Sequence, residues 1–228
     1  VTGVQTCALP ISVKLARHAV PCGTTDYRDV LDDDGVDAVV IASPPHTHLA
    51  ILADALAAGK HVLLEKPMAT GVVACDRILE AAKSSGRALQ MGFVCRRMPV
   101  VEMAHRCAQD GRLGRIYHAK ASMYRRRGVP GLGGWFTTKA RSGGGPLIDL
   151  GVHLLDATLH LMGHPRVTRV SGATYSNFGR RMKAYAHTSM WAGPPDFAGT
   201  CDVEDHVTAL LRCEGGATIE LNAVAEGG

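Results

Sequence analysis

Short, unbroken apolar runs alternate with longer runs of helical spacing along the first half of the chain. Runs of about four to eight aliphatic or β-branched residues are typical of strands that are buried on both faces of a parallel sheet. Such runs occupy residues 36–43, 61–66 and 88–94. The segments between them, 45–59 and 68–86, have apolar side chains at helical spacing. Strands that alternate with helices of this length predict βαβ crossovers, and hence a doubly wound parallel sheet.

Both predicted helices have a recognisable end. Gly59 and Gly86 directly follow the last residues with helical spacing, where glycine often ends a helix. We expect Thr70 to be the N-cap of the second helix. The apolar face of that helix is predicted to comprise Val73, Ile78, Leu79 and Ala82.

The pattern changes after Arg97. A helix predicted over 98–114 is followed by longer runs in which apolar and polar residues alternate imperfectly, which favours an α+β arrangement with an antiparallel sheet. These runs are 115–126, 166–177, 203–214 and 217–226, with a hairpin turn at Glu214-Gly215-Gly216. One long helix is expected over 142–163, and the glycines at its start allow another backbone or a ligand to approach closely.

Composition narrows the class of protein. Hydrophobic residues make up 46% of the 228 and charged residues 20%, which are globular averages. No apolar run approaches the roughly 18 residues of a membrane-spanning helix, so we expect no membrane partner. The net charge of +4 is small and scattered, which argues against nucleic acid. Seven cysteines without a C-x-x-C pair indicate free thiols in a reducing compartment, so a cytoplasmic location is the default expectation.

Two segments carry candidate chemistry. Lys66 ends a predicted parallel strand, and parallel sheets bind ligands at such strand ends. The same sequence is equally consistent with a surface lysine that pairs with Glu65. Asp149, His153 and Asp156 have the spacing of one helical face, with His160 one turn further along. This helical face is compatible with three interpretations: an acid-base histidine oriented by a carboxylate, an ion pair between residues four apart, or a metal site. The metal site has the least support. Arg125-Arg126-Arg127 is read as a solvated strand end.

Three motifs resemble the glucose-fructose oxidoreductase, inositol dehydrogenase and MocA (Gfo/Idh/MocA) family. They are A-S-P-P-H-T-H at 42–48, E-K-P at 65–67 and S-G-G-G-P-L-I-D-L-G-V-H-L-L-D at 142–156. The resemblance implies a Rossmann domain that binds NAD or NADP, then a domain with a large, mostly antiparallel sheet. It also implies hydride transfer to or from a secondary alcohol of a sugar, cyclitol or related polyol. The alternative is a catalytically silent sensor of sugar or dinucleotide on the same fold.

The resemblance assigns roles to individual residues. By motif, Lys66 holds and polarises the reacting oxygen, His153 exchanges the hydroxyl proton, and Asp149 assists His153. No metal is implied. The positions that match cofactor contacts of the family are Ser43, Pro44, Pro45, His48, Glu65, Lys66, Pro67 and Arg96. Trp135 is expected to wall the substrate pocket.

The chain departs from the family pattern at its ends. The glycine-rich turn and the ribose-reading acid of the family would precede Ser12 and are absent. We expect three parts: residues 1–11, an adapter-derived non-native segment; 12–97, an incomplete NAD(P)-binding Rossmann domain; and 98–228, an incomplete C-terminal domain for substrate and oligomerisation. As a polypeptide this fragment is expected to be inactive, and the full-length protein to be a homo-oligomer acting on a small sugar or polyol.

Overall fold

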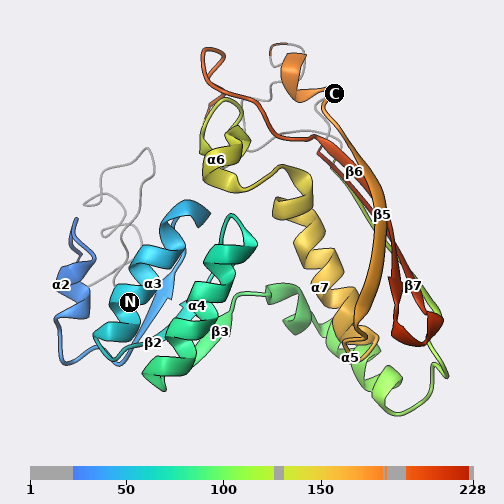
Figure 1. Ribbon diagram of the computed structural model, residues 1–228, viewed down its shortest axis with the longest axis horizontal. Coiled ribbons are helices and arrows are strands. Elements are labelled where there is room, and N and C mark those ends of the chain that lie inside the picture. Colours follow the sequence, from blue (N-terminus) through green and yellow to red (C-terminus); the bar gives the residue numbers. More distant parts are fainter. Residues whose placement is uncertain (1–22, 126–130, 182, 184–193, 226–228) are drawn as a thin grey trace. The chain divides into compact units, whose positions relative to one another are not determined.

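The computed structural model describes residues 23–125, 131–181, 183 and 194–225. The segment 1–11, expected to be non-native, lies outside the described residues. The chain divides into two compact units that meet between Gly92 and Phe93 (Figure 1). The boundary expected after residue 97 falls a few residues further along the chain.

The first unit is built on a parallel sheet with strand order β1-β2-β3. In register, Ile41 lies beside Leu64 and Leu64 beside Met91, so all three strands end at one edge. The predicted βαβ pattern is confirmed. The elements are α2 (Arg28–Leu31), β1 (Ala38–Ile41), η1 (Pro45–Thr47), α3 (His48–Ala57), β2 (His61–Leu64), α4 (Val72–Ser85) and β3 (Leu89–Met91).

One face of this sheet carries the core of the unit. Ile41, Val62 and Leu64 are buried there together with Leu52, Leu56 and Ile78 of the helices α3 and α4. On the opposite face Val40 is 58% exposed and Leu63 is 38% exposed. The prediction that these strands are buried on both faces is therefore wrong for β1 and β2. Continuous apolar runs do not distinguish one packed face from two.

Helix α4 differs in part from its prediction. Gly86 ends it with φ 65° and Gly59 follows α3 with φ 75°, so both predicted helix ends are confirmed. The N-cap, however, is Gly71 rather than Thr70. Ile78 and Ala82 pack in the core, whereas the other two residues of the predicted apolar face, Val73 and Leu79, are 69% and 52% exposed. Because α4 packs beside α3, only a narrow stripe of its apolar side chains is covered.

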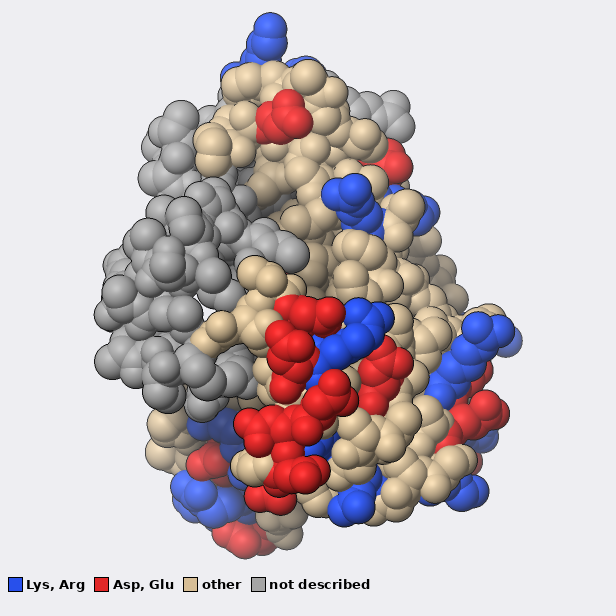
Figure 2. All heavy atoms as spheres, turned by 90° about the vertical axis from the view of Figure 1, so that its left-hand side faces the viewer, with Lys and Arg blue, Asp and Glu red and all other residues tan. Residues whose placement is uncertain are grey.

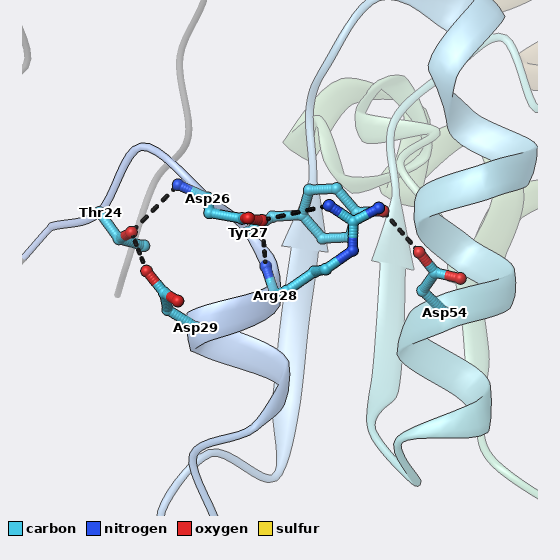
Figure 3. Close-up of polar contacts among 6 residues, drawn as sticks. All are labelled: Thr24, Asp26, Tyr27, Arg28, Asp29 and Asp54. Carbon is cyan, nitrogen blue, oxygen red and sulfur yellow. Dashed lines mark hydrogen bonds and ion pairs between the residues drawn. The ribbon is translucent and has the colours of Figure 1, made fainter.

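Polar contacts tie α2 to α3 on the surface of the first unit (Figure 3). The Tyr27 hydroxyl donates a hydrogen bond to the Asp54 carboxylate at 2.5 Å, and this bond is the main cause that raises the Tyr27 pKa. Exposed acidic side chains gather around α2, with Lys and Arg interspersed (Figure 2). The exposed aspartates in or next to α2 in the sequence are Asp26, Asp29, Asp32, Asp33 and Asp34.

The second unit contains a four-stranded mixed sheet with strand order β4-β7-β6-β5. The pairs β5–β6 and β6–β7 are antiparallel, as predicted. The pair β4–β7 is parallel, which differs from the prediction, and the long stretch of chain between the two strands allows it. The elements are η2 (Val94–Arg97), α5 (Pro99–Gln109), β4 (His118–Arg125), η3 (Trp135–Thr137), α6 (Lys139–Ser142), η4 (Leu147–Gly151), α7 (Val152–Leu161), β5 (Val167–Tyr175), η5 (Gly179–Arg181), β6 (His206–Cys213), η6 (Glu214–Gly216) and β7 (Thr218–Ala225).

Helix α7 packs along one face of this sheet (Figure 1). Leu154, Leu155 and Leu159 lie against the buried residues Leu211 and Ile219 of β6 and β7. This packing fixes the helix that carries His153. Within the described ranges, no helix is long and apolar enough to cross a membrane.

Candidate functional site

The first set of candidate residues lies at the carboxyl edge of the parallel sheet. The Glu65 amide donates to the carbonyl of Ile41 at 2.9 Å, and the Gly92 amide donates to that of Leu64 at 2.7 Å. These bonds continue the ladder past the ends of the strands. Hence the segment 43–45 after β1 and the segment 65–67 after β2 emerge at the same edge, which is where open α/β sheets bind ligands.

Glu65 and Lys66 have defined surroundings at this edge. The Lys66 amide donates to Glu65 Oε2 at 3.1 Å. A Cβ atom added to Gly92 would lie 3.1 Å from the Glu65 carboxyl carbon, so that carboxylate covers the glycine at the end of β3. Lys66 is half-buried, unlike a fully solvated surface lysine.

His48 lies behind the edge rather than on it. Its side chain is completely buried, and both ring nitrogens contact backbone carbonyl oxygens. The sequence matched this residue to a cofactor contact. In the structure it supports the strand ends from inside.

The second set begins with Asp149, which lies in a π-helical turn rather than in the predicted long α-helix. The Val152 amide bonds the Leu147 carbonyl, five residues back, across η4. The helix predicted over 142–163 is thus confirmed only over Leu147–Leu161, where a π turn comes first and α-helix follows from Val152. Asp149 is the middle residue of this π turn, whereas His153 and Asp156 lie in the α-helix that follows it. Such turns are frequent at functional sites.

The glycines before this turn permit a close approach of two backbones, as expected. A Cβ atom on Gly145 would lie 1.8 Å from the carbonyl oxygen of Glu204. The Gly145 carbonyl in turn accepts hydrogen bonds at 3.0 Å from the amides of Ile148 and Asp149. The segment before β6 thus packs directly against the residues that precede η4.

Asp149 has a cationic partner that the sequence analysis missed. Arg125, the last residue of β4, places Nη1 3.9 Å from Asp149 Oδ2. Its side chain is 30% exposed, so Arg125 is not the solvated strand end that was predicted. Arg126 and Arg127 lie outside the described residues. Nothing local in the sequence indicates this pair, because the two residues meet only when β4 and η4 pack together.

Arg96 is engaged by a carboxylate of the same unit. Its Nε and Nη2 donate to the two oxygens of Asp156 at 2.7 and 2.5 Å, and the Asp156 side chain is only 8% exposed. The hydrogen bond from Asp156 raises the Arg96 pKa. The sequence matched Arg96 to a cofactor contact, and the structure places its guanidinium on α7, one turn beyond His153.

His160, the last residue of the predicted helical face, lies among other histidine rings. His160 stacks on His105 of α5 with ring centroids 3.8 Å apart, and His164 lies 5.7 Å from His160. Burial first, then the positive charges of His105, Arg96 and His164, lower the His160 pKa. Among the described residues, no group of three or more His, Cys, Asp or Glu side chains is placed to hold a metal ion.

Trp135, the expected pocket wall, stacks on Phe136 with ring centroids 3.7 Å apart in η3. Its contribution to a pocket stays a prediction.

Matches to known proteins agree with both units. Residues 10–93 match the oxidoreductase family with an NAD-binding Rossmann fold. The parallel sheet and this match place the first unit in the oxidoreductase family with an NAD-binding Rossmann fold. Residues 101–226 match the GFO/IDH/MocA C-terminal domain. The chain belongs to the Gfo/Idh/MocA family.

Several relatives have a stated activity or ligand. The chain is 37% identical over 188 residues to a putative UDP-kanosamine synthase oxidoreductase subunit of Amycolatopsis mediterranei, covering 82% of this chain and 51% of the relative. It is 33% identical over 185 residues to the D-glucoside 3-dehydrogenase of Escherichia coli, covering 81% and 51%. A solved levoglucosan dehydrogenase in complex with NADH and levoglucosan is similar with a TM-score of 0.79 at 26% identity, covering 93% and 54%. The chain thus spans about half the length of the curated relatives it matches.

Proposed function

We propose that this chain is part of a dehydrogenase that transfers hydride between a nicotinamide cofactor and a secondary alcohol of a sugar, cyclitol or related polyol. The observation that supports this proposal most strongly is the position of Lys66. It is half-buried at the carboxyl edge of the parallel sheet, in a unit that matches NAD-binding Rossmann domains. The names of the relatives, which include a glucoside and a levoglucosan dehydrogenase, support the substrate class.

The residues at the edge of the sheet fit the nicotinamide end of the cofactor. The Glu65 carboxylate lies close to Gly92 there, 3.1 Å from where a Cβ atom would be, and the strand ends offer carbonyl groups and a lysine. The residues that would hold this end are Ser43, Pro44, Pro45, Glu65, Lys66 and Pro67. When bound, NAD or NADP supplies the hydride acceptor for oxidation, or the donor for reduction.

The proposed acid-base chemistry uses three side chains. A carbinol carbon releases hydride readily only as its hydroxyl is deprotonated, so the reaction needs a base and a cation near the developing alkoxide. His153 takes the hydroxyl proton, and Lys66 holds the oxygen as negative charge develops on it. Asp149 supports the charge that His153 gains. Arg125, 3.9 Å from Asp149, helps to hold that carboxylate in place.

Substitution of the three residues tests these roles in the complete product of the gene that encodes this chain. Lys66→Ala, Asp149→Ala and His153→Ala are each expected to lower kcat/KM by at least about 10-fold, since general acid-base groups contribute about 100-fold or more. Lys83→Ala and Asp76→Ala, at exposed positions of α4, are the matched controls and should stay near wild type. A cost of less than about 10-fold at any of the three would contradict the role given to that residue.

A further inference from the structure

His48 is a polar side chain in a place where water cannot reach it. It is the first residue of α3, directly after η1, and its side chain has 0% relative exposure. A buried imidazole is stabilised only if its ring nitrogens find partners inside the protein. The position of those partners therefore indicates the structural role of the His48 ring.

The partners come from two different loops. Nε2 lies 2.8 Å from the carbonyl oxygen of Ser43, which follows β1. Nδ1 lies 3.0 Å from the carbonyl of Pro67 and 3.2 Å from that of Met68, which follow β2. Carbonyl oxygens only accept, so the ring must donate to each loop that it binds. Hydrogen bonds to both loops at once therefore need a hydrogen on each ring nitrogen.

These contacts enclose Lys66. On one side, the amide of Glu65 is bonded to the carbonyl of Ile41 on β1. On the other side, the carbonyl of Pro67 is bonded to His48. The backbone of Lys66 is thus fixed through both of its neighbours, and a long lysine side chain is aimed reproducibly only if its origin is fixed.

We propose that His48 is a positioning residue for Lys66: a buried clasp that ties the two strand-end loops together and so fixes where the lysine side chain begins. It acts through Lys66 and need not touch substrate or cofactor. This inference rests on the role proposed for Lys66. Misplacement of a catalytic group by about 1 Å can cost about 100-fold in rate, so loss of the clasp is expected to be visible in turnover.

The test is a double-mutant cycle in the complete gene product, assayed as a dehydrogenase. His48→Phe fills the space but donates no hydrogen bond, and it should lower kcat by about 10- to 100-fold. In a Lys66→Ala background the same substitution should cost less than about 3-fold, because a residue that acts through Lys66 has nothing left to position. His48→Gln, which retains a donor, should recover part of the wild-type kcat.

His61→Phe is the matched control. His61 lies at the opposite end of β2, and its ring Nδ1 accepts a hydrogen bond at 3.0 Å from the Ala88 amide. It therefore reports the cost of losing a histidine contact to backbone without a change at Lys66, and its kcat should stay near wild type.

The possible outcomes separate the clasp from the proposed function. If His48→Phe leaves kcat unchanged, or costs the same with and without Lys66, the clasp is wrong although Lys66 keeps its role. If Lys66→Ala itself leaves kcat unchanged, the role of Lys66 fails and the clasp with it. Should His48→Phe not fold, the same cycle is run with His48→Gln, for which a smaller but equally non-additive loss is expected.

Discussion

Two carboxylates near His153 have arginine partners, and the two pairs differ in geometry. Arg96 binds Asp156 through two hydrogen bonds, and this carboxylate is nearly buried. Arg125 and Asp149 meet at 3.9 Å through one pair of atoms, and the Asp149 side chain is 21% exposed. The tight pair is suited to holding a helix in place. The looser one leaves its carboxylate accessible, as assistance to a proton transfer requires.

Also at the level of single residues, the low His160 pKa predicts a dependence of stability on pH. The unfolded chain takes up a proton on this histidine near its ordinary pKa of about 6.5, before the folded chain does. The free energy of unfolding should therefore fall as the pH drops below about 6.5, and the loss should end below the lowered pKa of the folded state.

Urea unfolding of the purified protein at pH 7.5 and 5.5 measures this loss. His160→Phe, which keeps a ring against His105 but does not titrate, should show a smaller difference between the two conditions than wild type. His46→Gln, at an exposed position, is the control and should behave as wild type. An unchanged difference in His160→Phe would contradict the effect ascribed to the stacked histidines.

At the level of elements, the pair of Arg96 and Asp156 joins η2 to α7. Asp156→Ala leaves the guanidinium without its two acceptors, and hydrogen bonds to charged groups contribute about 1.5 to 3 kcal/mol. We expect the free energy of unfolding to fall by about 2 kcal/mol. The exposed pair of Lys120 and Glu220, at 3.6 Å, supplies the control, because Lys120→Ala should cost less than about 1 kcal/mol. Equal losses in the two variants would show that the pair does not hold α7.

The elements that local pattern could predict are those whose limits are set by local chemistry. Helices α3 and α4 end where Gly59 and Gly86 adopt a left-handed backbone, and the strands of both sheets lie within their predicted runs. The exposed Val40 and the π turn at Asp149 could not be predicted in this way. The first depends on which face of the sheet is covered, and the second follows a point where Gly145 approaches Glu204, about 60 residues away in the sequence.

The same distinction applies to the site across the whole molecule. The motifs placed Lys66 at a strand end, and the register of the sheet agrees. They gave no indication that Arg125 meets Asp149 or that His48 turns inward, because both depend on contacts between elements distant in the chain. Family membership is carried by both units, since each matches its own part of the family.

Turnover of a polyol with a nicotinamide cofactor distinguishes the proposed dehydrogenase from a silent sensor. The complete gene product is to be assayed at the absorbance of reduced nicotinamide against a panel of sugars and cyclitols, with NAD and with NADP. We expect turnover of at least one polyol with one of the two cofactors. Binding of cofactor without turnover of any member of the panel, in either direction, would contradict the dehydrogenase and favour a catalytically silent sensor.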